Sequence, residues 1–265
     1  MSSSSIGLGA PPRGRRVLVV VPAHNEAATV ADVVERVRAV GFDCVVIDDA
    51  STDDTAARAA AAGARAVRLP VNLGVGGALR TGFRYAVERG YDTVVQCDGD
   101  GQHPPEGIPG LLAAADGADL VIGSRFLPGA ESFTIGRNRR LAMHWLSWLV
   151  RRRGGVDVAD TTSGFRCISQ PLLGEFARDF PTHYLGDTFE ALIVAARAGY
   201  AVAEVPTRIE ARPVGRSTAG GLAAMTFTLR ATVVVLLGNT ARVRRRSEMG
   251  APMRQPERSP SPDAS

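Results

Sequence analysis

The 265-residue sequence contains no lysine, and all 31 of its basic residues are arginine. Chemistry that needs a lysine amine, such as Schiff-base catalysis or the lysine of a phosphate-binding P-loop, is therefore excluded. Cysteine is scarce: Cys44, Cys97 and Cys167 are far apart, and the first two lie in or at the end of apolar, strand-like runs. This pattern is typical of buried thiols in a reducing compartment, and it argues against a disulfide framework or a CxxC metal site.

Long apolar runs and nucleic-acid motifs are missing as well. The N-terminus lacks the apolar core of a signal peptide. Residues 225–238 are strongly apolar, but Arg230 interrupts them, and the uncharged run is well short of the roughly 20 residues that a membrane span requires. We therefore expect no transmembrane helix and no DNA or RNA partner.

The net charge of +4 is carried by the two ends of the chain. Residues 1–16 and 242–265 each have a charge of +3, which leaves −2 for the rest. Both ends are rich in Ser, Pro, Gly and Arg and have no apolar periodicity. We expect a flexible N-terminus (1–15), one domain (16–240) and a disordered basic tail (241–265), with an anionic membrane surface as a weakly bound partner.

Between the ends, apolar strand-like runs alternate with segments of helical spacing. The predicted helices are 29–40, 52–63, 75–90, 136–153 and 186–199. The predicted strands are 16–22, 43–49, 64–70, 92–98, 118–126 and 201–209, and 160–169 reads as a loop that runs into a further strand. Continuous apolar strands that alternate with helices predict an α/β fold with a mostly parallel, Rossmann-like sheet covered on both faces.

Polar residues follow four of the predicted strands. They are His24, Asn25 and Glu26, then Asp48 and Asp49, then Asp98 and Asp100, and finally Ser124 and Arg125. Ligands bind at the carboxyl ends of the strands in such sheets. We therefore expect these four strand ends to meet at one edge.

The segment DGDGQHPP (98–105) is the main candidate for a metal site. Gly99 lets the backbone bend so that Asp98 and Asp100 can face a shared ligand. Carboxylate and amide oxygens suit a hard cation such as Mg²⁺ or Mn²⁺. An acidic turn that caps the next helix is the alternative, and this segment alone does not separate the two. His103 adjoins the loop, but the proline after it argues against a role as ligand.

The glycine-rich segment NLGVGG (72–77) is not a dinucleotide fingerprint, because Leu79 occupies the position of the third glycine. It predicts a close backbone turn beside the ligand, at the start of a helix.

Six segments in order resemble the family 2 glycosyltransferases with the GT-A fold. They are PAHNE (22–26), VVIDDASTDDT (45–55), NLGVGGALRTGF (72–83), DGDGQHPP (98–105), GSRF (123–126) and DTTSGFR (160–166). Within the family, the chain is most similar to the dolichyl- and polyprenyl-phosphate sugar transferases. The resemblance covers about residues 16–237.

The resemblance implies a role for each matching position. The loop of the first strand and the paired acids of the second would hold the nucleotide sugar, through Pro22, His24, Glu26, Ile47 and Asp49. His24 stands where the family usually has tyrosine. The D-x-D motif and the glutamine after it would bind Mg²⁺ or Mn²⁺ and the donor diphosphate, through Asp98, Gly99, Asp100 and Gln102.

Arginines would serve the acceptor and the leaving group. The resemblance assigns the acceptor phosphate to Arg125 and Arg139 and counts Arg125 with the two aspartates as catalytic. Arg166 and Glu190 match family positions with less defined roles. In the late Arg-x5-Lys pair, Arg212 matches, but threonine occupies position 218, and Arg216 is the candidate to supply the missing charge.

The resemblance also implies an inverting, metal-dependent transfer of a sugar from a GDP-mannose or UDP-glucose type of donor to a polyprenyl phosphate. The expected location is the cytoplasmic, inner face of the membrane, as a peripheral protein, and a small membrane subunit is a further candidate partner. Amphipathic interfacial helices are expected at about 137–153 and 222–238. The first contains Trp145 and Trp148 with Leu141, Leu146 and Leu149 between arginines, a composition typical of an interfacial helix; a core helix with basic ends is the alternative.

Two other functions fit the same sequence. One keeps the donor site but uses a soluble acceptor, such as a sugar or glycerate. The other is a non-catalytic protein that binds sugar nucleotides or serves as a membrane scaffold. The intact set of Asp98, Asp100 and Gln102 counts against the second, because simple binding needs no metal beneath a leaving group.

Overall fold

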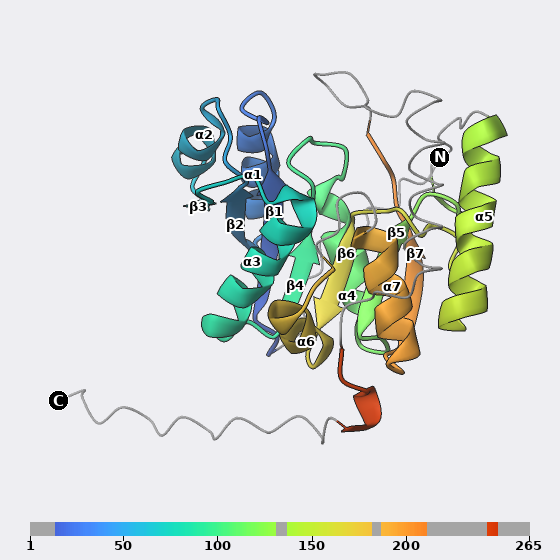
Figure 1. Cartoon of the computed structure of the whole chain (residues 1–265). Coiled ribbons are helices and arrows are strands. Elements are labelled where there is room, and N and C mark those ends of the chain that lie inside the picture. The colour runs from blue at the N-terminus through green and yellow to red at the C-terminus, as the bar shows by residue number, and fades with distance from the viewer. Residues whose placement is uncertain (1–13, 131–136, 182–186, 211–242, 249–265) are drawn as a thin grey trace, which may run out of the picture.

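The structure is a computed structural model that describes residues 14–130, 137–181, 187–210 and 243–248. It contains one seven-stranded sheet with the strand order β3-β2-β1-β4-β6-β5-β7 (Figure 1). The strands are β1 (Val17–Ala23), β2 (Asp43–Asp48), β3 (Arg65–Arg68), β4 (Thr93–Gln96), β5 (Leu120–Ser124), β6 (Arg166–Ser169) and β7 (Val202–Pro206). The α-helices are α1 (Val30–Ala39), α2 (Thr55–Ala61), α3 (Gly74–Glu88), α4 (Ile108–Ala114), α5 (Arg137–Gly154), α6 (Leu172–Arg178) and α7 (Asp187–Arg197), with 3-10 turns η1 (Pro105–Gly107) and η2 (Arg246–Glu248).

The sheet is mostly parallel, as the sequence predicted. Strands β1 to β4 pair in parallel with their neighbours among themselves, and β5 pairs in parallel with β7. Strand β6 lies between β4 and β5 and runs antiparallel to both. Because β6 runs in the opposite direction, the loop before it (160–165) reaches the same edge as the carboxyl ends of the parallel strands.

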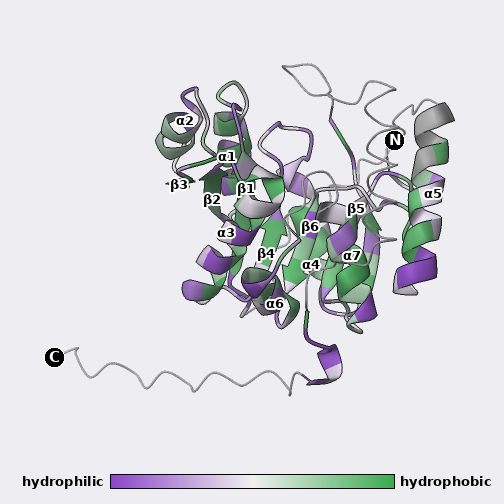
Figure 2. Ribbon diagram, viewed as in Figure 1, coloured by the Kyte–Doolittle hydropathy of each residue, from purple (hydrophilic) through white to green (hydrophobic). Residues whose placement is uncertain are grey.

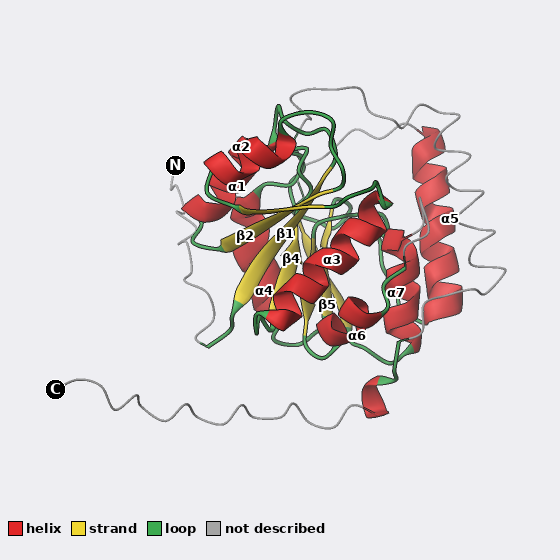
Figure 3. Ribbon diagram, turned by 60° about the vertical axis from the view of Figure 1, so that its left-hand side comes forward, coloured by secondary structure: helices red, strands yellow, loops and turns green. Residues whose placement is uncertain are grey.

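Helices cover both faces of the sheet, and the alternation of side chains along each strand fills both interfaces. In β1, Leu18 and Val20 join a cluster that includes residues of α3, α6 and α7, whereas Val19 and Val21 join a second cluster with α1 and α4. Figure 3 shows α3, α6 and α7 in front of the strands, with α1 and α4 behind. The strands are apolar along most of their length (Figure 2), as expected for a sheet buried on both faces.

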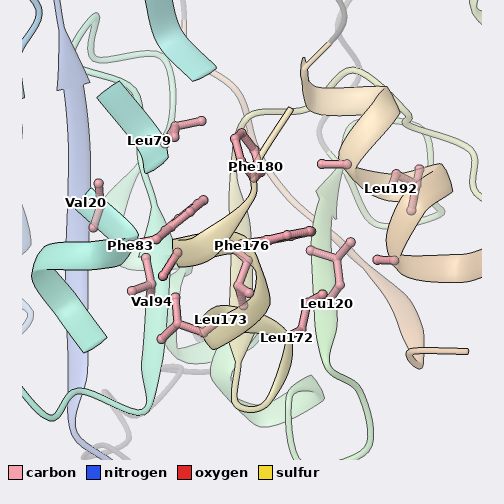
Figure 4. Close-up of a cluster of buried hydrophobic side chains, with 14 of the residues drawn as sticks. Val20, Leu79, Phe83, Val94, Leu120, Leu172, Leu173, Phe176, Phe180 and Leu192 are labelled. Atoms are coloured by element: carbon pink, nitrogen blue, oxygen red, sulfur yellow. The ribbon is translucent and has the colours of Figure 1, made fainter. Parts of the chain in front are cut away.

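Helix α3 packs closely on the sheet because Gly82 has no side chain. A Cβ at this position would lie 2.3 Å from Cγ1 of Val20. Beyond α3 the core is aromatic: the Phe83 ring lies 6.1 Å from the Phe176 ring and 5.1 Å from the Phe180 ring. Such pairs add about 0.5–1.5 kcal/mol each beyond the area that they bury. Figure 4 shows this cluster, to which α6 contributes Leu172, Leu173 and Phe176. This helix was not predicted from the sequence.

Helix α5 lies beside α7 at the outer edge of the molecule (Figure 1). Its inner face belongs to the core: Leu146 and Leu149 are 1% and 3% exposed. Its outer face carries Leu141, Trp145 and Trp148, which are 75%, 45% and 43% exposed. Of the five apolar residues expected to face a membrane interface, Leu146 and Leu149 are instead buried within the protein. The exposed apolar face of α5 therefore consists of Leu141, Trp145 and Trp148.

Part of the predicted disordered tail packs on the domain. Residues 243–248 are described, and the backbone N–H and Nε of Arg244 donate to the buried carboxylate of Glu175 at 2.9 and 3.0 Å. The backbone N–H of Arg246 also donates to the carbonyl of Ala198 at 2.7 Å. The expected helix 222–238 lies outside the described residues. Among the helices of the described ranges, none is long and apolar enough to cross a membrane.

Candidate active site

A cavity of about 240 Å³ lies at the carboxyl edge of the sheet, where the ends of β1, β2 and β4 meet the start of α3. Most of the residues predicted to bind the nucleotide sugar line it. They are Pro22, His24, Glu26, Asp49, Asp98, Gly99 and Asp100. The sequence therefore located three of the converging strand ends correctly.

The wall made by β1 and β2 is held in place by backbone contacts. Oδ1 of Asp49 accepts a hydrogen bond from the backbone N–H of Leu73 at 2.7 Å, which fixes the start of α3. Nδ1 of His24 lies 2.8 Å from the carbonyl oxygen of Asp49, so the ring is held by a hydrogen bond in the tautomer that carries the proton on Nδ1. Asn25 and Ala50 both have φ of 56°, a left-handed conformation that is strained for alanine and that clusters at functional sites.

The two aspartates of the D-x-D motif line the same cavity after the end of β4. The carboxylate of Asp98 is 35% exposed, and its Oδ2 lies 3.5 Å from Nδ1 of His103. Oδ1 of Asp100 accepts a hydrogen bond from the backbone N–H of Gln102 at 3.0 Å. Neither aspartate caps the following turn η1, which begins after Pro104 without a side-chain cap. The helix-cap alternative is therefore not what the loop forms.

These residues fit a hard divalent cation. Both carboxylates line one cavity, and the oxygens of Asp98 make no hydrogen bond to any residue in the described part of the chain. Within the same part, no group of three or more His, Cys, Asp and Glu side chains could hold a metal. Two carboxylates with the remaining positions left to water and substrate phosphates are what Mg²⁺ commonly uses.

Gly164, in the loop before β6, lies directly against Asp98. A Cβ at position 164 would be 2.7 Å from Oδ2 and 3.1 Å from Oδ1 of that carboxylate. Any side chain at position 164 would therefore collide with the carboxylate of Asp98, and glycine avoids this collision.

His103 lies behind the cavity rather than in its lining. Its side chain is buried, and the ring stacks on Phe165 at 5.4 Å with an interplanar angle of 18°. Next to it, burial raises the pKa of the Cys97 thiol well above its usual value, and the charge of Asp98 raises it further. This cysteine is therefore a neutral packing residue.

Arg125, at the end of β5, is held by a buried carboxylate. Its Nε and one terminal nitrogen donate to Asp160 at 2.6 and 2.7 Å, and the same terminal nitrogen donates to Oγ1 of Thr162 at 2.7 Å. Asp160 is fully buried, whereas the Arg125 side chain remains 13% exposed. The other terminal nitrogen, Nη1, has no hydrogen bond to the described residues.

Arg166 fixes the loop that supplies these contacts. Its guanidinium donates to the backbone carbonyls of Ser163, Thr161 and Thr188, and the residue is 3% exposed. The side chain therefore braces loop 160–165 from inside against the start of α7. Glu190, which matched another family position, is fully buried on α7.

Several predicted residues are not brought to the cavity. The Ile47 side chain is fully buried in the core and does not line the cavity. Among the described residues, Gln102 makes its hydrogen bonds through the backbone, from its N–H to Asp100 and from the N–H of Glu210 to its carbonyl. Arg139 lies on α5, but its side chain is not described, and Arg212, Arg216 and Thr218 lie outside the described residues.

The contacts made by Asp160, Thr162 and Gly164 were not predicted from the sequence. All three belong to DTTSGFR (160–166), which was recognised as a motif, but only its arginine was assigned. In the sequence, these residues form a short polar segment before a strand. Such a segment lies at the same edge as the cavity only if the strand runs antiparallel, and a local sequence pattern does not give the direction of β6.

Comparison with solved structures assigns the architecture to a class. Glucosyl-3-phosphoglycerate synthase from Mycobacterium tuberculosis, in complex with Mn²⁺, UDP and glucosyl-3-phosphoglycerate, is similar with a TM-score of 0.63 and 28% identity. The similarity covers 84% of this chain and 79% of that one. The fold is that of the GT-A glycosyltransferases.

The chain belongs to glycosyl transferase family 2, whose model matches residues 18–174. Undecaprenyl-phosphate mannosyltransferase of Micrococcus luteus is 34% identical over 214 residues, which cover 78% of this chain and 88% of the relative. Polyprenol monophosphomannose synthase of Mycolicibacterium smegmatis is 33% identical over 218 residues, which cover 78% of this chain and 82% of the relative. The protein is thus a family 2 glycosyltransferase, and the predicted resemblance is confirmed.

Proposed function

We propose that this enzyme transfers a hexose from a nucleoside diphosphate donor to a polyprenyl phosphate, with a divalent cation bound by Asp98 and Asp100. The observation that carries the proposal is the shared cavity. Both carboxylates line it together with His24 and Asp49, and Asp98 lies against the loop that contacts Arg125. The names of the two relatives favour mannose as the sugar.

The donor binds in the cavity at the ends of β1, β2 and β4. Its base and ribose lie on the wall formed by His24 and Asp49, where the histidine ring offers a stacking surface. Its diphosphate lies toward Asp98 and Asp100. A cation held by Asp98 and Asp100 would supply positive charge to offset the negative charge of the diphosphate leaving group.

The reaction is a single in-line displacement. An oxygen of the acceptor phosphate forms a bond to the anomeric carbon, while the bond from this carbon to the donor diphosphate breaks and its electron pair leaves with the nucleoside diphosphate. A phosphate oxygen is already ionised at neutral pH, so the site needs no strong general base. Arg125 holds the acceptor phosphate through the edge of its guanidinium that Asp160 does not use.

A second cavity supports a lipid acceptor. It has a volume of about 510 Å³ and lies between α5 and the segments next to Arg125 and Asp160. Phe126, Leu127, Met143, Trp148 and Val158 supply most of its apolar lining. A prenyl chain attached to a phosphate at Arg125 would find its first apolar contacts there.

The outer face of α5 supports a membrane location. The rings of Trp145 and Trp148 stack at 4.9 Å and, with Leu141, form an exposed stripe at spacings of four and three residues. Arg151, Arg152 and Arg153 follow in the last turn. Exposed tryptophans beside a basic cluster are typical of helices that lie in an anionic membrane interface.

The test is a partition assay with purified protein, Mn²⁺, undecaprenyl phosphate in detergent, and radiolabelled GDP-mannose or UDP-glucose. We expect label to enter the organic phase, and Asp100→Ala to abolish this transfer. If neither donor labels the lipid and the variant behaves like the wild type, the proposal is wrong.

Membrane binding is measured separately by co-sedimentation with vesicles that contain anionic lipid. Trp145→Ala/Trp148→Ala should reduce the bound fraction several-fold. Val87→Ala, which removes an exposed apolar residue from α3 instead, is the matched control and should not change it.

A soluble phosphorylated acceptor is the second candidate, because the similar synthase from Mycobacterium tuberculosis was solved in complex with phosphoglyceric acid. The same assay distinguishes the two. Label that stays in the aqueous phase and depends on added 3-phosphoglycerate would favour the soluble acceptor.

A further inference from the structure

Helix α1 contacts the metal loop (residues 98–102) near the helix N-terminus, through Thr29. This residue is 4% exposed, and its Oγ1 lies 2.7 Å from the carbonyl oxygen of Gly99, between the two aspartates. The carbonyl and one carboxylate oxygen of Glu26 are farther away, each at 3.3 Å. Because a hydroxyl has one hydrogen, the shortest contact defines its donor bond, which goes to Gly99.

The same helix makes a second connection two turns later, through Arg36. Its guanidinium donates to both oxygens of Glu106 at 3.2 and 2.8 Å and to both oxygens of Glu210 at 3.0 and 3.1 Å. Asp32, one turn earlier on the helix, is 3.9 Å away. Hydrogen bonding to Glu106 and Glu210 raises the pKa of Arg36 further above its usual value, so the side chain is charged at every relevant pH.

Both glutamates adjoin the metal loop. Glu106 lies in η1, which begins three residues after the end of the loop. The backbone N–H of Glu210 donates to the carbonyl of Gln102 at 3.0 Å, so it holds the last residue of the loop. Arg36 thus connects α1 to the end of the loop in two ways, while Thr29 holds its middle.

We infer that Thr29 and Arg36 are positioning residues that brace the metal loop against α1 and so orient Asp98 and Asp100 toward the cation. Neither residue lines the donor cavity. The inference rests on the proposed metal-dependent function and adds to it the part of the scaffold that sets the ligand geometry.

The physical reason lies in the loop itself. It is short, contains Gly99 and Gly101, and carries two carboxylates whose negative charges repel each other in the absence of a cation. Thr29 holds the carbonyl of Gly99, which lies between the two aspartates, and Glu210 holds the carbonyl of Gln102, which follows them. These two contacts restrict the conformations of both carboxylate side chains before a cation binds. Residues that orient metal ligands commonly change metal affinity by about 10–100-fold when they are replaced.

The test measures Mn²⁺ binding directly, by EPR titration of free Mn²⁺ in the presence of UDP and, separately, of GDP. Thr29→Val removes the hydroxyl with little change in shape, and Arg36→Met removes the guanidinium. We expect each to weaken Mn²⁺ binding by about 10-fold. Thr29→Ser keeps the donor and should restore affinity to within about 2-fold of the wild type.

Arg38→Met is the matched control. Arg38 lies on the same helix, but its guanidinium donates to the carbonyl of Gly63, away from the metal loop. Its loss should leave Mn²⁺ affinity within about 2-fold of the wild type. All titrations are made well below the melting temperature of each variant, so a general loss of stability does not affect the comparison.

Amide hydrogen exchange of the metal-free protein gives a second readout. The peptide that covers residues 98–102 should exchange faster in Thr29→Val and Arg36→Met than in Arg38→Met. If the wild type binds Mn²⁺ and both brace variants match it in affinity and in exchange, the inference is overturned while the proposed function stands. If the wild type binds no Mn²⁺ with either nucleotide, the proposed function fails, and the inference fails with it.

Discussion

Replacement of Gly164 by alanine tests whether the loop before β6 sets the position of Asp98. The new Cβ would lie 2.7 Å from Oδ2 and 3.1 Å from Oδ1, where ordinary contacts begin at 3.4 Å. The carboxylate must therefore turn or withdraw by several tenths of an ångström. Because it is the free end of a side chain that is 35% exposed, this movement should cost only about 1 kcal/mol of stability.

The effect on function should be much larger than the effect on stability. A displacement of catalytic groups by about 1 Å can lower the rate about 10²-fold. We therefore expect donor turnover in Gly164→Ala to fall by about 10–100-fold. Metal affinity should fall with it, which EPR of free Mn²⁺ would measure. Thermal unfolding would show that the variant is still folded.

Gly110→Ala is the control for this experiment. Gly110 lies in α4, and a Cβ there would meet nothing within 4 Å. The change should leave turnover unaltered and increase stability by up to about 1 kcal/mol, since alanine favours the helix. Turnover and Mn²⁺ affinity in Gly164→Ala equal to those of Gly110→Ala would refute the role assigned to this loop.

Three further predictions concern stability. Asp160→Asn removes the buried charge that holds Arg125, and it should lower the free energy of unfolding by about 3–5 kcal/mol in urea denaturation. Ala50→Gly relieves a left-handed φ of 56° and should raise stability by about 0.5–1 kcal/mol, seen as a higher melting temperature. Burial raises the pKa of the Cys44 and Cys167 thiols from 9.0 to about 12. The unfolded chain therefore loses these protons first, and stability should fall from pH 9 to pH 12 by about 1.4 kcal/mol per pH unit for each thiol; a flat profile would contradict this.

The sequence predicted the parallel part of the fold well, because its strands are continuous apolar runs buried on both faces. Val17–Ala23 and Asp43–Asp48 begin and end within a residue or so of the predicted segments. The direction of β6 and the helix α6 were not predicted. Strand direction follows from pairing with residues far away in the sequence, as in the contact of Arg166 with Gln96, and no local period records it.

The site was predicted to the same extent and for the same reason. Residues that follow parallel strands, such as Asp49 and Asp98, were located because parallel strands end at a common edge. Asp160 and Gly164 were not located, because they precede an antiparallel strand. Arg36 was also missed: on a helix surface it has the pattern of an ordinary solvated charge, and its partners Glu106 and Glu210 are 70 and 174 residues away.

The absence of lysine acquires a structural meaning at this site. Arg36 connects two carboxylates, Arg125 connects a carboxylate and a hydroxyl, and Arg166 connects three backbone carbonyls. A planar guanidinium can hold several acceptors in fixed directions, whereas an ammonium is a point charge on a flexible stem.

Two of these arginines, Arg125 and Arg166, bind loop 160–165. One end, Asp160, orients Arg125, and the other, at Gly164, faces Asp98. Since Arg166 holds the same few residues from the core side, the spacing between the proposed acceptor phosphate and the proposed donor diphosphate is set by one short segment. A change anywhere in it should therefore alter both halves of the reaction, whereas a change in the wall of His24 and Asp49 should alter donor binding alone.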